Sequence, residues 1–245
     1  MNPQVSATDD GRCSRPYIWR RTLQNDITDD RVRDQYVRAM GADLGQLCHE
    51  LQDDFDWLRG KWSEFQELFE KGQERIDLLN TVASNFFYFL HRLLFEDAML
   101  HLCRLTDRSR MGDRETLTVM ALTETISDPT LKASVETKTE EVRKNCQFAR
   151  KWRNRRLAHT DLETLREGYP LALPPVASTN IHTALKSIDD LLTLIENHYG
   201  LPHFLLGRDP WGAKSLVYYL EKAKHAIDDE QQRWREAAKG AAPNS

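Results

Sequence analysis

The fold is decided by residues 32–69, which read VRDQYVRAMGADLGQLCHELQDDFDWLRGKWSEFQELF. Apolar side chains recur at every third or fourth position of this stretch, which is the spacing of one face of an α-helix. The sequence therefore predicts one long amphipathic helix with a bend at Gly60 and an end near Gly72. The apolar positions are Val32, Tyr36, Met40, Leu44, Leu47, Leu51, Phe55, Leu58, Trp62, Phe65, Leu68 and Phe69.

A second helix is predicted from about residue 76 to residue 105, and its apolar residues cover more than one face. Such a helix belongs at the centre of a bundle. Its aromatic run at 86–89 (FFYF) is either a stacking platform for bases or bulk for the core. Because the run lies on the most apolar helix of the chain, core packing is the favoured interpretation. The apolar residues of the helix are Leu79, Val82, Phe86, Phe87, Leu90, Leu93, Leu94, Met99 and Leu102.

The rest of the chain continues the helical pattern. Four further helices are predicted: a short one at 116–126 capped by Asp113 or Thr116, one from Pro129 that runs into a basic motif, one at 179–199 and a last one at 214–238. They are separated by a charged loop at 107–113, a break at 168–175 and a connector at 200–212. No run alternates with period two between turn residues, so no strand is predicted. The predicted fold class is all-α, a helical bundle with a long N-terminal helix and extra C-terminal helices.

Three parts make up the predicted domain organisation. Residues 1–28 form a flexible N-terminal arm, residues 29–200 the helical bundle domain, and residues 201–245 a connector and a charged C-terminal helix. A chain of 245 residues is long enough to bury a sizeable core. The charged last helix is interpreted as a solvated surface, with a partner-docking role as the alternative.

Composition excludes several classes of protein. The net charge of −4 means that any binding of nucleic acid must rely on a local basic patch. Cys13, Cys48, Cys103 and Cys146 are scattered without a CxxC pair, so we expect reduced thiols and no disulfide framework. Residues 86–105 are the most apolar stretch, but charged and histidine residues interrupt it, so no membrane span is expected. Without an apolar signal segment at its start, the chain is expected in the cytoplasm.

Positive charge is concentrated in residues 143–156, which hold seven Lys or Arg residues and no Asp or Glu. This segment runs into the motif 153–159, which reads RNRRLAH. Clustered cations attract phosphate, and a histidine moves protons near neutral pH, so the segment is a candidate site for RNA chemistry. The seven cations are Arg143, Lys144, Arg150, Lys151, Arg153, Arg155 and Arg156.

Three residues of the motif suit the metal-independent cleavage of RNA. In this reaction a base removes the proton of the 2′-hydroxyl, the oxygen attacks the adjacent phosphorus, and the 5′-oxygen departs. The protein supplies a proton-transfer group and positive charge. Arg153 offers a planar fork of donors for phosphate oxygens, Asn154 orients the imidazole or the substrate, and His159 handles the proton. We expect neither a metal site nor a cofactor. The cations expected to bind RNA around these three are Arg150, Lys151, Arg155 and Arg156.

The spacing within the motif adds a condition. On an uninterrupted helix, residues 153 and 159 lie about 9 Å apart along the axis and about 120° apart around it. The two side chains therefore converge only if the helix is broken within the motif or if a second subunit brings its own copy. A symmetric homodimer would place two motifs across one groove. The alternative is that the cations complement the C-terminal dipole of a helix, and the residues alone leave both interpretations open.

Other titratable residues receive ordinary interpretations. His91 and His101 share one helix without an HxxxH or ExxH spacing, so we interpret them as satisfied or partly exposed histidines rather than metal ligands. Arg104 and Asp107 are predicted to pair with each other or to cap the helix end, with added charge beside an RNA groove as the alternative for Arg104. The carboxylates at 96–97 are predicted to form ordinary ion pairs, although pairing with a motif arginine is the alternative.

An arginine, a polar residue and a histidine four to six residues further on, at the end of a helix in an all-α bundle, resemble the HEPN superfamily. Within it, the chain is similar to the AbiU-type abortive-infection branch. The resemblance covers roughly residues 40–200. It is carried by the motif at 153–159 and by the segment 104–107 (RLTD) that ends the aromatic-rich second helix. It is also carried by the aromatic ending of the first helix, at Trp62, Phe65 and Phe69.

The resemblance implies a homodimer whose paired motifs form a metal-independent endoribonuclease of a prokaryotic abortive-infection or toxin–antitoxin system. It places Arg153 at the scissile phosphate, Asn154 as a positioning group and His159 as the proton-transfer group. An antitoxin or another product of a neighbouring gene is an implied partner. Some toxin members carry a tyrosine two positions after the histidine, which a partner nucleotidyltransferase modifies; here Asp161 stands there, so that route of silencing is not expected. The alternative function is a non-catalytic module, an antitoxin or regulatory subunit, that binds RNA or a protein partner.

Overall fold

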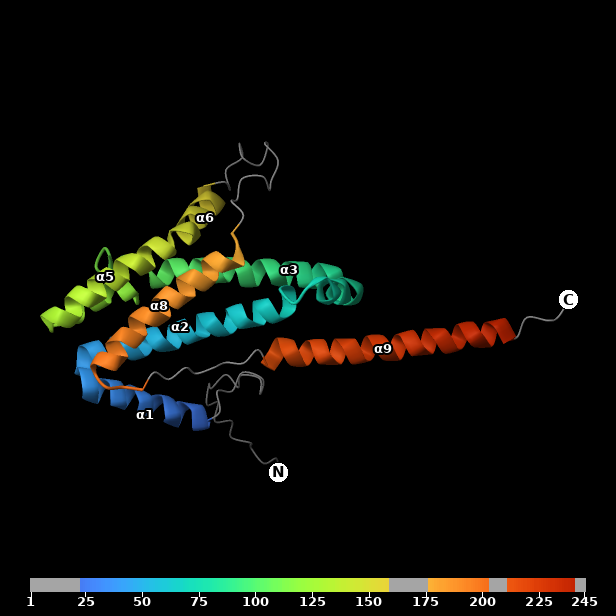
Figure 1. The fold of residues 1–245 in the computed structure, drawn as a ribbon, viewed down its shortest axis with the longest axis horizontal. Coiled ribbons are helices and arrows are strands. Elements are labelled where there is room, and N and C mark those ends of the chain that lie inside the picture. Colours follow the sequence, from blue (N-terminus) through green and yellow to red (C-terminus); the bar gives the residue numbers. More distant parts are fainter. Residues whose placement is uncertain (1–22, 159–175, 203–210, 241–245) are drawn as a thin grey trace, which may run out of the picture.

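The computed structural model describes residues 23–158, 176–202 and 211–240. Within them the chain forms a bundle of α-helices, so the predicted all-α fold is confirmed (Figure 1). The longer helices are α1 (Leu23–Met40), α2 (Ala42–Phe69), α3 (Gln73–Leu105), α5 (Pro129–Asn145), α6 (Gln147–Ala158), α8 (Ser178–His198) and α9 (Trp211–Gly240). The short elements are the strands β1 (Arg110–Met111) and β2 (Arg114–Glu115), the 3-10 helix η2 (Val119–Ala121) and α4 (Leu122–Thr125). The domain boundaries at 28 and 200 stay a prediction.

Helix α2 lies at the centre of the bundle and packs against α1, α3, α8 and α9. Leu51, Phe55 and Leu58 on its apolar face are fully buried. Towards its end, the ring of Trp62 stacks on that of Phe65 with 4.6 Å between the centroids. The apolar stripe recognised in the sequence therefore forms the middle of the core, as the period of 3.6 residues predicts.

The prediction of one continuous helix over residues 32–69 is wrong, because the structure has two helices there. Gly60 lies inside α2, whereas the chain breaks between α1 and α2 at Gly41, which has a φ of 85°. Glycine reaches this left-handed conformation without the steric cost that a Cβ atom adds. The two helices then cross closely at Gly45, where a Cβ atom would lie 2.6 Å from backbone atoms of Tyr36 and Val37.

The prediction that the aromatic run of α3 packs in the core is wrong for three of its four residues. Phe87 is buried, but Phe86, Tyr88 and Phe89 are 59%, 58% and 62% exposed. Successive residues of a helix point about 100° apart. Because α2, α6 and α9 cover only part of the circumference of α3, an aromatic run must leave some rings outside.

The helix predicted from Pro129 into the basic motif is two helices. Asp128 caps α5 by accepting from the Leu131 N–H at 2.7 Å, and Pro129 occupies the first turn. The chain then breaks at the buried Cys146, and α6 begins at Gln147. No glycine or proline marks this break, so the sequence pattern did not indicate it.

The connection between α3 and α5 holds the only strands among the described residues, a two-residue antiparallel ladder between β1 and β2. It turns at Gly112, which has a φ of 64°. The short helix predicted at 116–126 is η2 followed by α4. Its cap is Thr118, which accepts from the Met120 N–H at 3.3 Å, and not Asp113 or Thr116.

Replacing Gly45 by alanine should destabilise the fold, because the added methyl group meets the α1 backbone, which cannot rotate away as a side chain can. We expect a loss of about 1–3 kcal/mol in the free energy of unfolding, measured by urea denaturation. The control is Gly212→Ala, where the nearest atom to the new Cβ is a Glu64 oxygen at 3.4 Å. If both variants unfold at the same urea concentration as the wild type, the close crossing of α1 and α2 is wrong.

Candidate functional site

The motif helix α6 is held by the loop that follows α3. Arg153 donates from Nη1 to Oδ2 of Asp107 at 3.0 Å, and the Nε atom of Arg150 lies 3.8 Å from Oδ1 of the same carboxylate. Arg150 also donates to the carbonyl oxygen of Thr106. The two arginines are neighbours on one face of the helix because they are three residues apart. Asp107 therefore contacts two cations of α6, Arg150 and Arg153, at one partly buried point.

The loop itself is fixed by threonines. The hydroxyl of the buried Thr106 donates to the carbonyl of Leu102 at 2.7 Å. The buried Thr118 hydroxyl lies within hydrogen-bond distance of the carbonyls of Leu105 (2.9 Å) and Asp107 (2.8 Å). These bonds hold the end of α3 and the start of the next segment against each other, so the Asp107 carboxylate has a defined position beside α6.

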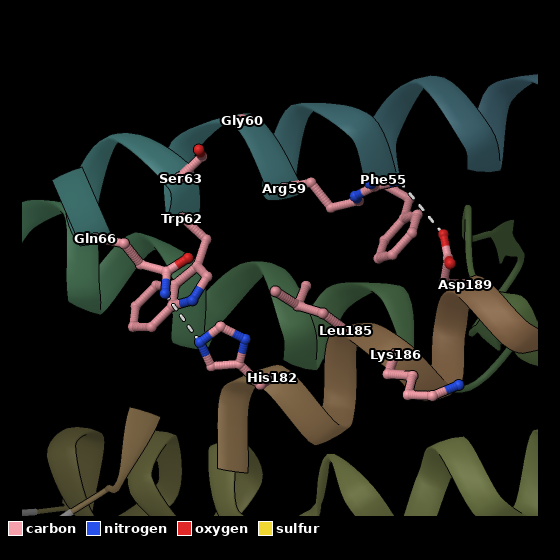
Figure 2. A pocket seen from close by; sticks show the side chains of 10 residues that line it. All are labelled: Phe55, Arg59, Gly60, Trp62, Ser63, Gln66, His182, Leu185, Lys186 and Asp189. Carbon is pink, nitrogen blue, oxygen red and sulfur yellow. Dashed lines mark hydrogen bonds and ion pairs between the residues drawn. The ribbon is translucent and has the colours of Figure 1, made fainter. Parts of the chain in front are cut away.

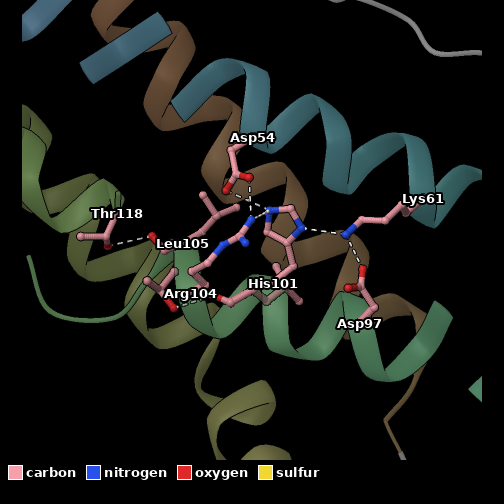
Figure 3. A network of polar contacts seen from close by, with 9 residues as sticks. Asp54, Lys61, Asp97, His101, Arg104, Leu105 and Thr118 are labelled. Atoms are coloured by element: carbon pink, nitrogen blue, oxygen red, sulfur yellow. Dashed lines mark hydrogen bonds and ion pairs between the residues drawn. The ribbon is translucent and has the colours of Figure 1, made fainter. Parts of the chain in front are cut away.

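The prediction that Arg104 and Asp107 pair through their side chains is wrong. Arg104 turns to α2 and donates from Nη2 to Oδ1 of Asp54 at 2.5 Å, as Figure 3 shows. His101, one turn earlier on α3, points at the same carboxylate and lies 2.9 Å from Oδ2. The other ring nitrogen of His101 lies 3.0 Å from Nζ of Lys61. The interpretation of this histidine as a satisfied core residue is confirmed.

Asp54 is the acidic centre of this network. Burial by itself would raise the pKa of Asp54, but hydrogen bonds and charge from His101 and Arg104 outweigh the burial, so the pKa lies below its ordinary value. The carboxylates at 96–97 make ordinary ion pairs, as predicted: Asp97 pairs with Lys61, and Glu96 with Arg92 at 3.0 Å. The network therefore joins α2 to α3, whereas the described bonds of Arg150 and Arg153 go to Asp107 and Thr106.

Two other side chains of α6 are exposed to solvent. Lys151 and Asn154 are exposed, whereas Arg153 is partly buried against Asp107. The backbone of Arg155 and Arg156 is part of α6, but the structure does not describe their side chains. His159 also lies outside the described residues. The structure thus brings Arg150 and Arg153 together, and the convergence of Arg153 with His159 stays a prediction.

An aromatic pocket of about 410 Å³ adjoins the motif helix. The ring of Trp152, which precedes Arg153, meets Phe95 edge-on with 5.8 Å between the centroids. His91 lies 4.9 Å from the ring of Phe69. Burial lowers the pKa of His91, and the Glu70 carboxylate opposes this only in part, so the imidazole is neutral at neutral pH. The lining residues are Trp62, Phe65, Phe69, Glu70, His91, Phe95, Trp152, Val176 and Ser178.

A second cavity, of about 340 Å³, lies between α2 and α8. In Figure 2 the side chains of Arg59 and Asp189 meet across it, and Nη1 and Oδ1 are 3.3 Å apart. At its other end, Gln66 reaches His182 with 2.9 Å between the two nitrogens. Four of its polar side chains are thus already bonded in pairs, Arg59 with Asp189 and Gln66 with His182.

The described cysteines do not act as nucleophiles. Cys48, Cys103 and Cys146 are buried and free. Burial raises the pKa of the three thiols to about 12, 11 and 12, so they stay protonated at neutral pH. Cys13 lies outside the described residues.

Among the residues that the structure describes, no group of three or more His, Cys, Asp or Glu side chains is placed to bind a metal ion. None of the described helices has the length and apolar character needed to cross a bilayer.

The structure defines an all-α bundle. In this bundle the loop at the end of α3 positions a basic helix, α6. The model of the HEPN_AbiU2 family, described as AbiU2, matches residues 41–210 of the chain. The match covers more than half of the 245 residues, so the chain belongs to the AbiU2 family of HEPN proteins. Comparison with curated proteins and with solved structures gives no match. The recognition made from the sequence is confirmed.

Asp107→Asn should loosen the attachment of α6. The substitution leaves the guanidinium groups of Arg150 and Arg153 partly buried without their carboxylate, and we expect a loss of about 1–2 kcal/mol in the free energy of unfolding, measured with urea. Asp113→Asn, in the exposed turn nearby, is the control and should change little. Equal stability of the wild type and Asp107→Asn would show that the carboxylate does not hold the motif helix.

The pH dependence of stability should report on Asp54. Its pKa is lower in the folded protein than in the unfolded chain, so its stabilising effect is complete above the ordinary aspartate pKa of about 3.9 and is lost as the pH falls through the folded value. We expect Asp54→Asn to lower the free energy of unfolding by about 1–2 kcal/mol at pH 7, and by progressively less as the pH falls below the ordinary aspartate pKa. Glu50→Gln, exposed on the same helix, is the control. A difference that stays constant with pH would contradict this assignment.

Proposed function

We propose that this chain is a metal-independent endoribonuclease of a prokaryotic abortive-infection or toxin–antitoxin type defence system. The observation that carries the proposal is the position of Arg153. It lies in an AbiU2 domain, fixed by the Asp107 carboxylate at 3.0 Å, on the basic helix that leads to His159. A guanidinium that is oriented before the substrate arrives stabilises developing negative charge without reorganising.

Arg153, Asn154 and His159 have distinct roles in the proposed reaction. Arg153 uses one nitrogen for Asp107, and a guanidinium has five N–H donors, so others remain for the oxygens of the scissile phosphate. His159 takes the proton of the 2′-hydroxyl or returns one to the departing 5′-oxygen, and Asn154, exposed beside Arg153, positions the imidazole or the substrate. The products are a 2′,3′-cyclic phosphate and a free 5′-hydroxyl.

The surroundings of the motif suit an RNA strand. Arg150 and Lys151 precede Arg153 and Asn154 on α6, and Arg155 and Arg156 follow these two residues on the same helix, so cations lie on both sides of the proposed phosphate contact. The aromatic pocket beside Trp152 gives an unpaired base a surface on which to stack. A homodimer brings two motifs to one groove, and a protein encoded nearby, such as an antitoxin, restrains the activity. The proposed location is the cytoplasm.

The purified chain should cleave generic single-stranded RNA in the presence of EDTA. His159→Ala and Arg153→Ala should each lower the rate by roughly 100-fold or more, which is the range of one general acid–base or charge-stabilising group. The readouts are the rate of cleavage on gels and the detection of the cyclic phosphate by mass spectrometry. His198→Ala and Arg33→Ala, exposed on α8 and α1, are the matched controls and should keep the wild-type rate.

A second function, a non-catalytic RNA-binding module, is supported by the ion pairs that Asp107 already makes with Arg150 and Arg153, because a purely structural role produces the same pairs. Its signature in the same experiment is RNA binding that survives His159→Ala, weakens steeply with salt and is accompanied by no cleavage. Cleavage that is equal in the wild type, His159→Ala and Arg153→Ala would remove the nuclease assignment.

A further inference from the structure

The aromatic pocket beside α6 has a continuous row of rings in its walls. From Trp152 on α6 the rings follow one another through Phe95 and Phe65 to His91, with centroids 5.8, 6.3 and 4.9 Å apart. The ring of Phe69, at the end of α2, completes the row at 4.9 Å from His91. Phe69 and Phe95 line the cavity of about 410 Å³ and are only partly buried. A cavity of this size is within the range of ligand pockets, and its walls suit a flat aromatic ligand.

A carboxylate lies at the α2 end of this row. Glu70 directly follows Phe69 and also lines the pocket. Its Oε2 atom accepts from Nε2 of Gln66 and from the hydroxyl of Ser178, each at 3.1 Å. Both hydrogen bonds that Glu70 makes within the described residues therefore use one oxygen. They hold the carboxylate in place, while Oε1 can accept from a ligand.

His91 adds a hydrogen-bond donor near this carboxylate. Burial lowers the pKa of His91, and the charge of Glu70 opposes this in part, so the two side chains are close enough to interact. A neutral imidazole has one N–H donor and one acceptor nitrogen. The pocket thus combines aromatic walls, a group that only accepts hydrogen bonds and a group that donates one.

We propose that this pocket binds a guanine base of the RNA strand, with N1–H and N2–H₂ of the base donating to Oε1 of Glu70 and an N–H of His91 donating to O6. The assignment rests on the proposed function, since it names the base that lies beside the scissile phosphate. Guanine has two adjacent donors on its Watson–Crick edge, and hydrogen bonds to a carboxylate are strengthened by its charge. Adenine, cytosine and uracil each present one donor group there, next to acceptors that a carboxylate repels.

The distribution of charge along the pocket agrees with a bound nucleotide. Trp152, at one end of the row of rings, is followed directly by Arg153 and preceded by the exposed Lys151. Positive charge therefore lies at the α6 end, and the negative charge of Glu70 lies at the α2 end. A guanosine nucleotide has the complementary polarity, because its phosphate is negative and the far edge of its base carries donors. The two ends of the pocket would thus orient the base relative to the phosphate.

Isothermal titration calorimetry with nucleoside 3′-monophosphates tests the assignment without any cleavage. The full-length chain is titrated with guanosine, inosine, adenosine, cytidine and uridine 3′-monophosphate. We expect guanosine monophosphate to bind roughly tenfold tighter than inosine monophosphate, which lacks the 2-amino group and so one hydrogen bond to the carboxylate. Equal affinity for these two probes, tighter binding of another base, or no measurable binding of any probe overturns the proposal.

Glu70→Gln should remove the difference between guanosine and inosine monophosphate, because the amide has lost the negative charge and one of the two acceptor oxygens. Glu74→Gln, exposed in the first turn of α3, is the matched control and should keep the difference. Circular dichroism verifies that both variants stay folded. If Glu70 only joins Gln66 to Ser178, its substitution lowers stability but leaves the preference between the two probes unchanged, and that result contradicts the proposal.

Phe69→Leu tests whether the base lies among the rings. Loss of stacking should weaken the binding of guanosine and inosine monophosphate alike, by roughly tenfold, and should preserve the ratio between them. Phe86→Leu, exposed on α3 outside the pocket, is the control. Unchanged affinity in Phe69→Leu would place the nucleotide elsewhere on the protein, and the assignment of the pocket would be wrong.

Mapping of cleavage sites separates this proposal from the nuclease activity. RNA oligonucleotides with a single guanine should be cut beside that guanine by the wild type and without base preference by Glu70→Gln. His159→Ala should lose cleavage but retain the calorimetric preference for guanosine monophosphate. Selective binding of guanosine monophosphate without cleavage of any RNA would refute the nuclease and support the pocket. Cleavage without a preference for guanine would support the nuclease and refute the pocket.

Discussion

Burial of the apolar face of α2 is the constraint on which the rest of the structure depends. Leu51, Phe55 and Leu58 are fully covered because α1, α3 and α8 pack around this helix. The bare Cα of Gly45 lets α1 approach α2 closely, and the hydroxyl of Tyr36 on α1 donates to Glu196 on α8. Once α2 is enclosed, the direction of α3 is set, and with it the position of the loop that receives the motif helix.

The Asp107 carboxylate turns that packing into a candidate site. Asp107 lies just after α3, where threonine hydroxyls bond to the backbone carbonyls of this loop. Its carboxylate forms an ion pair with the guanidinium of Arg153 on α6. The other acidic centre, Asp54, binds His101 and Arg104 and stabilises the contact between α2 and α3. The two networks have different roles. The network of Asp54 joins two helices of the bundle, and the network of Asp107 fixes the orientation of Arg153 on the basic helix.

The exposed aromatic rings of α3 and the exposed tryptophan of α9 are not part of the packed core. A bundle that is well packed inside does not need Phe86, Phe89 or Trp234 outside, and such large side chains are costly to leave in water. This chain of the AbiU2 family thus carries two separate features, the basic helix α6 and the exposed apolar side chains of α3 and α9.

The sequence by itself determined the all-α class and the course of most helical segments, because apolar periodicity is a local property of the chain, and it was enough to recognise the family. It also located the basic segment, since the cations are clustered within residues 143–156. Only the tertiary structure decided that the first break falls at Gly41, that Asp107 is the partner of Arg153 and that most of the aromatic run of α3 is exposed. The physical reason is the same in each case. Periodicity shows that one face of a helix is apolar, but whether a neighbour covers that face, and which distant carboxylate reaches an arginine, depends on how separate helices pack.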